Sequence, residues 1–269
     1  MDLFKVIISF NNNSIYFHLF KNVIGQLKQN EHKVFIVIKK KDVLEGLVKS
    51  SGWEYFNLLK EGRKDTRFGI AKGMLLQDFR LLKFCFKHKP DILVGTSFAI
   101  SHVGKVLAIP SINVNEDDAE VVPLYAKMAY PWASVILSPS TCSTGKWENK
   151  TIHYSGYHEL AYLHPNHFKA NQQVVNKYVD ENTEFCIIRF AKLTAHHDDG
   201  ISGISDHIAL KLIEMIEPHI RIIITSERKL NDSLEPYRLA ISPEDMHDLI
   251  ARASMYVGDS QTMAAEAGV

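Results

Sequence analysis

The residues with the clearest chemical potential lie at 255–269, the last fifteen positions of the sequence. Their pattern predicts a short strand, a tight polar turn and the opening of a helix. Such a turn directs free backbone N–H groups and the positive end of a helix dipole at one point, which suits a phosphate. We expect Ser260, Gln261 and Thr262 to hold that phosphate. Glu266 lies about two helical turns beyond the turn, within reach of a ribose hydroxyl.

Two arginines lie where the predicted strands of the second half of the chain end. Arg189 stands at the end of one strand, and Arg228 follows the next strand along the sequence. A guanidinium at either position could clamp a diphosphate leaving group, because it donates paired hydrogen bonds and carries a fixed positive charge. A surface salt bridge is the alternative interpretation of each arginine.

His18 is a candidate general base in the first predicted helix, between Phe17 and Leu19. A histidine can deprotonate an acceptor hydroxyl near neutral pH. The alternative is a histidine on the helix surface, or one whose hydrogen bonds are satisfied in the core.

The loop that follows the first predicted strand contains no glycine, so the G-x-G-x-x-G pattern of a dinucleotide site is absent. Its side chains Asn11, Asn12 and Asn13 suit sugar hydroxyls. The alternative is that these asparagines occupy positive-φ positions of an ordinary loop. A nicotinamide or flavin dehydrogenase is therefore not expected.

An acidic turn, Asn115-Glu116-Asp117-Asp118, follows another predicted strand. Glu116 or Asp117 could act as a base or stabilise a developing oxocarbenium charge. The alternative role of this turn is to cap the helix that we expect to follow it. Capping needs only one of the acids, so Glu116 or Asp117 would remain available for chemistry.

Four potential metal ligands are adjacent in the sequence: His196, His197, Asp198 and Asp199. Adjacent residues rarely all point at one ion, and no pair of ligands at helical i, i+4 spacing accompanies them. We therefore predict a solvated loop and no metal site.

Composition narrows the class of protein. The 269 residues include 31 basic and 31 acidic side chains, so no overall field recruits nucleic acid or an anionic membrane. The odd number of cysteines, three, predicts reduced thiols in a cytoplasmic protein. We expect Cys85 and Cys186 to be core residues. The N-terminus predicts a strand and no signal peptide, and no apolar stretch is long enough for a membrane span.

Apolar runs rich in β-branched residues alternate along the chain with stretches of helical periodicity. The predicted strands are Lys5–Ser9, 34–38, 53–58, 91–94, 110–114, 134–137, Phe185–Phe190, 220–225 and 256–257. One predicted helix has its apolar face at Leu75, Phe79, Leu82 and Phe86. This alternation predicts an α/β fold of two Rossmann-like, doubly wound parallel-sheet domains. They are residues 1–165 and 166–269, and we expect the second to be incomplete.

Short motifs support a family resemblance. They are Tyr-Phe-His-Leu-Phe-Lys at 16–21, His-Lys-Val at 32–34, Lys-Pro-Asp at 89–91, Gly-Tyr-His-Glu at 156–159 and Tyr-Leu at 162–163. In these motifs the chain resembles the family called domain of unknown function 354. That family is similar to UDP-N-acetylglucosamine 2-epimerases and to glycosyltransferases of the GT-B fold, so the resemblance implies a GT-B-like arrangement of the two domains.

The terminal stretch also resembles an epimerase motif, Asp-Ser-Gly-Gly-x-Gln-Glu-Glu-Ala. In those enzymes the turn holds the diphosphate, and the second glutamate holds the uridine ribose. Asp259, Ser260 and Glu266 match the motif, whereas Gln261 and Thr262 replace its two glycines. Their side chains narrow the space for a diphosphate held by backbone groups.

The resemblance implies a GT-B-like glycosyltransferase in surface polysaccharide or glycolipid synthesis. Its donor is a nucleotide-diphosphate sugar, expected to be UDP-linked and bound by the second domain. Its hydroxyl acceptor meets the first domain at His18, and no further cofactor is expected. The alternatives are a UDP-N-acetylglucosamine 2-epimerase-like enzyme and a non-catalytic nucleotide-sugar-binding protein. Because the second domain is expected to be incomplete, we expect these 269 residues alone to lack the activity.

Overall fold

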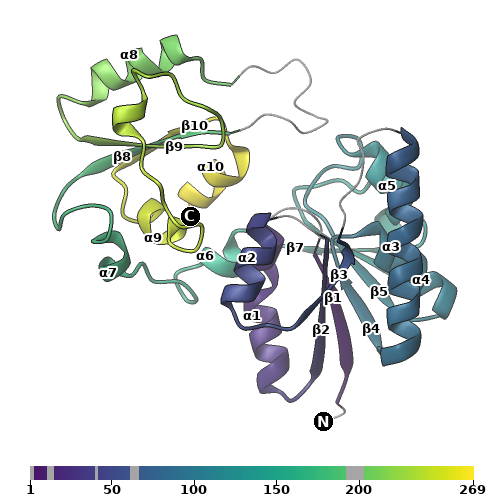
Figure 1. Ribbon diagram of the computed structural model, residues 1–269. Coiled ribbons are helices and arrows are strands. Elements are labelled where there is room, and N and C mark those ends of the chain that lie inside the picture. Colours follow the sequence, from purple (N-terminus) through teal and green to yellow (C-terminus); the bar gives the residue numbers. More distant parts are fainter. Residues whose placement is uncertain (1–2, 11–14, 40–41, 61–66, 192–202) are drawn as a thin grey trace. The chain divides into compact units, whose positions relative to one another are not determined.

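The computed structural model describes residues 3–10, 15–39, 42–60, 67–191 and 203–269. They form two compact units, Met1–Tyr162 and Leu163–Val269 (Figure 1). The division follows Tyr162, whereas the sequence placed the domain boundary after residue 165. Each unit is an α/β structure built on a parallel sheet, so the predicted fold class is confirmed.

Seven parallel strands form the sheet of the first unit, in the spatial order β3-β2-β1-β4-β5-β6-β7. The strands are β1 (Lys5–Ser9), β2 (Lys33–Lys39), β3 (Tyr55–Leu59), β4 (Ile92–Gly95), β5 (Ser111–Val114), β6 (Val135–Pro139) and β7 (Thr151–Tyr154). The order reverses between β1 and β4, because the chain moves outward from β1 in one direction and from β4 in the other. Ligands of open α/β sheets bind beside such a reversal, at the carboxyl ends of the strands.

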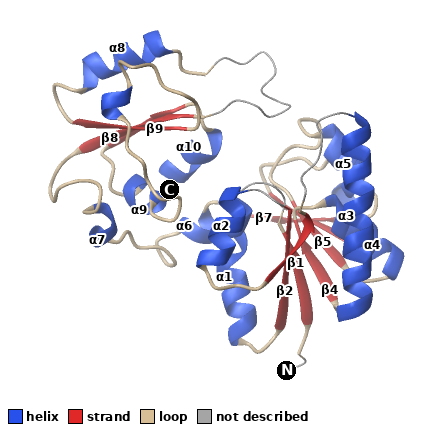
Figure 2. Ribbon diagram, in the orientation of Figure 1, coloured by secondary structure: helices blue, strands red, loops and turns tan. Residues whose placement is uncertain are grey.

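Helices cover both faces of this sheet, as Figure 2 shows. They are α1 (Ile15–Gln29), α2 (Asp42–Ser50), α3 (Arg67–His88), α4 (Phe98–Leu107) and α5 (Pro123–Ala129), with a 3₁₀ helix at Gly145–Lys150 and α6 (Leu160–Leu163) at the division. Apolar side chains of α1 and α2 pack on one face with Ile8 and Ile36. Those of α3 and α4 pack on the other face with Ile7 and Leu93. Because alternate residues of β1 enter opposite cores, both faces of the sheet are buried.

Two close approaches of the backbone fix the point where the strand order reverses. Gly95 ends β4 with φ +150°, and a Cβ atom built on it would lie 2.1 Å from the carbonyl oxygen of Ser9 at the end of β1. Thr96 N–H then donates to that same oxygen at 3.2 Å. The β1 and β4 ends therefore meet so closely that only glycine fits.

Helix α3 has an orientation that the sequence did not predict. Its periodicity is helical, but Leu75, Phe79 and Phe86 of the predicted apolar face are 71%, 64% and 64% exposed. The helix instead turns Leu81 and Cys85 into the core. The predicted helix is confirmed, and the predicted direction of its apolar face is wrong.

The second unit holds a parallel sheet of three strands in the order β10-β8-β9. Its strands are β8 (Phe185–Phe190), β9 (Arg221–Ser226) and β10 (Met255–Gly258), and its helices are α7 (Gln172–Val175), α8 (Asp206–Ile216), α9 (Met246–Ile250) and α10 (Gln261–Ala267), with a 3₁₀ turn at Glu235–Tyr237. Helix α8 packs on one face, and α7, α9 and α10 pack on the other. The strand order reverses between β8 and β10, so the same rule places a ligand at the carboxyl ends of those two strands.

Candidate functional site

The carboxyl edge of the first unit holds a paired glutamate and histidine. Glu116 follows β5, and its Oε2 lies 3.0 Å from Nδ1 of His158, which follows β7. The Glu116 side chain is 30% exposed and that of His158 only 1%. The atoms are close enough for an ion pair but are not aligned for a hydrogen bond. An accessible carboxylate therefore lies in front of a buried imidazole, an arrangement suited to accepting a proton from a bound hydroxyl.

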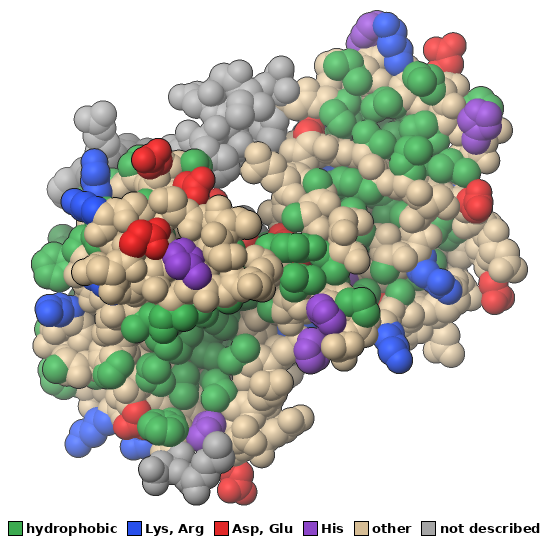
Figure 3. Space-filling view, turned by 180° about the vertical axis from the view of Figure 1, so that it is seen from behind, with side chains coloured by type: hydrophobic (Ala, Val, Ile, Leu, Met, Phe, Trp, Pro, Cys, Tyr) green, Lys and Arg blue, Asp and Glu red, His purple; other side chains and the backbone are tan. Residues whose placement is uncertain are grey.

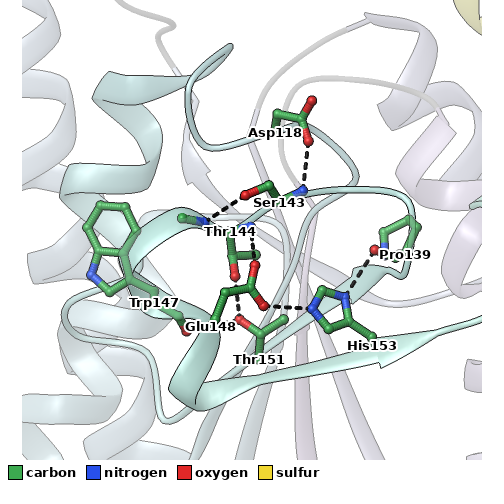
Figure 4. Close-up of polar contacts among 9 residues, drawn as sticks. Asp118, Pro139, Ser143, Thr144, Trp147, Glu148, Thr151 and His153 are labelled. Carbon is green, nitrogen blue, oxygen red and sulfur yellow. Dashed lines mark hydrogen bonds and ion pairs between the residues drawn. The ribbon is translucent and has the colours of Figure 1, made fainter.

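The loop after β6 holds the turn that carries Glu116. The Cys142 thiol donates a hydrogen bond to the Glu116 carbonyl oxygen at 2.9 Å. Ser143 N–H donates to the Asp118 carboxylate at 2.7 Å, as Figure 4 shows. These contacts fix the turn from a neighbouring segment. The thiol thus has a structural role that no sequence motif predicted.

The same loop is held in turn by Glu148 (Figure 4). Its carboxylate accepts from the Thr144 backbone N–H and pairs with His153 Nε2, both at 2.8 Å. The hydrogen bond from His153 lowers the pKa of Glu148, and Glu148 raises the pKa of His153. Both side chains are exposed enough for solvent to weaken the pair.

Two tyrosines adjoin the acidic turn. Burial, and secondly the negative charges of Asp117 and Glu116, raise the pKa of Tyr16 in α1. Burial and the charge of Glu116 raise the pKa of Tyr154, whose ring stacks on His158 with 6.4 Å between centroids. Both phenols stay protonated at physiological pH, so neither adds a second negative charge beside Glu116.

The helix-capping interpretation of the acidic turn is wrong. Helix α5 begins at Pro123, and the preceding Val122 provides no side-chain cap. Asp117 is exposed, and its carbonyl oxygen accepts from Asn115 Nδ2 at 2.9 Å. None of the acids is used as a cap for this helix.

His18, the base proposed from the sequence, is largely enclosed. It is 9% exposed, and its ring contacts Phe17 at 5.2 Å and Tyr162 at 5.4 Å between centroids. These aromatic neighbours leave little of the ring for an acceptor to reach. The geometry agrees better with the alternative interpretation, a core histidine, than with a base in contact with substrate.

In the second unit, both predicted arginines lie at the carboxyl edge and both have carboxylate partners. Arg189 pairs with Glu227, and Arg228 pairs with Asp206 at 3.0 Å. Arg228 also donates to the Ile204 carbonyl oxygen at 2.8 Å. The predicted positions at the strand ends are confirmed. A diphosphate at this edge would have to compete with Glu227 and Asp206 for the guanidinium groups.

Asp259 spans the point where the strand order of the second unit reverses. Its Oδ1 accepts from Ala191 N–H at 2.6 Å, and its Oδ2 accepts from Ile204 N–H at 3.0 Å. From its position after β10, one carboxylate therefore joins the residue after β8 to Ile204, which precedes the N-cap of α8. Sequence comparison found Asp259 as part of the terminal motif but gave no indication of this bridge.

The start of α10 has the geometry that the sequence predicted, and its later part does not. Ser260 is the N-cap and accepts from Met263 N–H at 3.4 Å; Gln261 is exposed and Thr262 is half-buried. Glu266, however, turns into the unit, where its Oε1 lies 3.1 Å from His247 Nε2. Its side chain is 7% exposed, so a contact with a ribose hydroxyl would require Glu266 to leave this partner.

Some predicted positions lie outside the described residues. These are the asparagines Asn11, Asn12 and Asn13 and the run from His196 to Asp199. Within the part of the chain that the structure describes, no group of three or more His, Cys, Asp or Glu side chains could hold a metal ion. Among the described helices, none combines the length and hydrophobicity required to cross a membrane.

Solved structures of two enzyme classes resemble this fold. UDP-GlcNAc 2-epimerase from Methanocaldococcus jannaschii matches with a TM-score of 0.70 and 15% identity, covering 98% of this chain and 80% of that one. The Neisseria meningitidis enzyme bound to UDP-GlcNAc matches at 0.64 and 13%, covering 96% and 78%. The spinosyn rhamnosyltransferase SpnG, complexed with thymidine diphosphate, matches at 0.61 and 12%, covering 98% and 76%. These similarities show a GT-B-like fold.

A comparison with curated proteins finds no match. The family described as "Protein of unknown function (DUF354)" matches residues 4–269, in agreement with the resemblance seen in the short motifs. The chain therefore belongs to the DUF354 family.

Proposed function

We propose that this protein is a sugar transferase that uses a nucleotide-diphosphate donor, UDP-linked, and a hydroxyl acceptor. The observation that carries the proposal is the exposed Glu116 carboxylate, 3.0 Å from the buried His158 imidazole, at the carboxyl edge of the first unit. A carboxylate in this position is suited to take the proton of a hydroxyl, and the buried His158 ring lies directly behind it.

The reaction needs few groups. The acceptor hydroxyl attacks C1 of the sugar and gives its proton to Glu116, while the bond from C1 to the diphosphate oxygen breaks and the nucleoside diphosphate leaves. Tyr16 and Tyr154 stay protonated near the carboxylate, so neither adds a negative charge that would compete for the proton. Asp117, exposed in the same turn, remains a second candidate to stabilise the developing positive charge.

The donor is proposed to bind the second unit at the ends of β8 and β10. The positively charged side chains of Arg189 and Arg228 would bind the diphosphate. Ser260, Gln261 and Thr262, at the start of α10, would hold it as well. Support comes from solved structures of the same fold whose descriptions include bound UDP-GlcNAc or thymidine diphosphate. For Glu266 to contact the ribose, its side chain would first have to break its contact with His247. An acceptor in surface polysaccharide or glycolipid synthesis is part of the proposal through the family resemblance.

The second candidate is a nucleotide-sugar 2-epimerase, favoured by solved epimerase structures among those that share the fold. Incubation with UDP-sugars separates the functions. Free UDP that appears only with an acceptor supports transfer, and a C2-inverted sugar supports epimerisation. Binding without turnover supports a non-catalytic protein.

Variants test the role of Glu116 directly. Glu116→Gln should lower turnover about 10²–10⁴-fold, the usual contribution of a general base, with little change in donor affinity. Glu45→Gln is a matched control, because Glu45 also pairs with neighbouring side chains, Lys49 and Tyr55, in the first unit. If Glu116→Gln and Glu45→Gln turn over equally well, Glu116 is not the base.

A further inference from the structure

An exposed apolar stripe runs along α3. Leu75, Phe79 and Phe86 are 71%, 64% and 64% exposed. Spacings of four and seven residues place them on one side of a helix. Large apolar side chains grouped in this way on a surface mark a site of interaction more often than scattered ones do.

A groove of about 840 Å³ lies beside this stripe, between α3 and the strands β2 and β3. Aromatic rings form much of its wall. Phe84 packs on Phe56 at 5.0 Å and on His88 at 4.2 Å between centroids, and Phe79 of the stripe also lines the groove. Phe79 belongs to both, so the stripe and the groove adjoin and form one surface.

The charges that line the groove are nearly all positive. Its basic lining residues are Lys33, Lys60, Arg80, Lys83 and Lys87, whereas Glu54 is the sole acid among the described residues that line it. Burial, and then the charges of Lys87 and Lys33, lower the pKa of His88. Over the whole chain, positive and negative charges balance, and the net charge is zero. On the face drawn in Figure 3, acidic and basic side chains are interspersed.

We propose that this surface docks the protein onto an anionic phospholipid membrane. Apolar side chains would enter the boundary between headgroups and acyl chains, and the lysines would meet the negative headgroups. Lysine stems can lie along the apolar surface while their ammonium groups reach the headgroups. A second copy of the chain fits less well, since a two-fold interface here would bring like charges together. The proposal does not depend on the proposed function.

The test is flotation of the purified protein with vesicles of phosphatidylcholine, with and without phosphatidylglycerol. We expect binding only when phosphatidylglycerol is present, and weaker binding as salt increases. Lys83→Gln and Lys87→Gln should each lower the partition coefficient about fivefold. Leu75→Ser and Phe79→Ser should each lower it about tenfold or more.

Helix α8 of the second unit provides matched controls. Met215 is 71% exposed, as Leu75 is, and Lys211 is exposed on the same helix. Met215→Ser and Lys211→Gln should leave vesicle binding unchanged. The proposal is overturned if anionic vesicles do not bind the protein at low salt, or if the α8 variants lose as much binding as the α3 variants. A concentration-dependent dimer that Phe79→Ser abolishes would also overturn it, in favour of a second copy.

Discussion

Replacing Asp259 by asparagine should destabilise the second unit by an amount that the structure allows us to estimate. The carboxylate accepts two backbone N–H groups, from Ala191 at 2.6 Å and Ile204 at 3.0 Å. Asparagine keeps one acceptor oxygen and turns an NH₂ group toward the other N–H, so one hydrogen bond is lost. A bond to a charged group contributes about 1.5–3 kcal/mol. Because Asp259 is half-buried, the lower end applies, about 1.5 kcal/mol.

Thermal unfolding followed by circular dichroism measures this loss. For a unit spanning Leu163–Val269, a change of 1 kcal/mol shifts Tm by about 4 °C, so Asp259→Asn should lower Tm by about 6 °C. Asp248→Asn is the control, because Asp248 accepts the N–H of Asn171 through one oxygen only, and asparagine can keep that bond. If both variants lower Tm equally, Asp259 does not bridge the ends of β8 and α8.

Three further predictions concern other positions. Gly95→Ala should cost about 3 kcal/mol or more, or prevent folding, because its Cβ would meet the Ser9 carbonyl oxygen; a stable, unchanged unfolding transition would contradict it. His102 lies 2.9 Å from the Asp78 carboxylate, which raises its pKa. The resulting stabilisation is complete below the unfolded pKa of 6.5 and is lost as pH rises through the higher folded value. Asp78→Asn should therefore lower Tm at pH 6 more than at pH 9, and a loss independent of pH would refute the pairing. Ser260→Ala should cost about 1 kcal/mol and Ser260→Gly only a few tenths, whereas equal losses in urea unfolding would show that the cap is not formed.

The sequence predicted the strands that appear as nearly continuous runs of apolar residues. Lys5–Ser9 and Phe185–Phe190 have the predicted bounds, because nearly continuous apolar runs favour strands buried on both faces. Strand β7 was missed, since Thr151–Tyr154 is a short edge strand whose side chains are partly buried or exposed. Periodicity also identified helix α3 without showing which of its sides faces the sheet.

Site residues were predictable when their chemistry was local. Glu116 follows a strand in an acidic turn, and this pattern was sufficient to make it a candidate. His158 was quoted only for family resemblance, because its partner lies 42 positions earlier and meets it only through the order of β5, β6 and β7. Glu266 was assigned to a ribose from its position in a motif. A helix of seven residues, however, turns that side chain inward onto His247.

The most direct measurement of the central claim is calorimetric titration of the purified chain with UDP-GlcNAc, UDP and UMP. We expect UDP-GlcNAc and UDP to bind at one competing site and UMP to bind more weakly, because it lacks the second phosphate that the arginines are proposed to hold. Arg228→Ala should weaken UDP more than UMP. If neither UDP nor UDP-GlcNAc gives any binding heat, or if the three ligands bind alike with both wild type and Arg228→Ala, the proposed donor site is wrong.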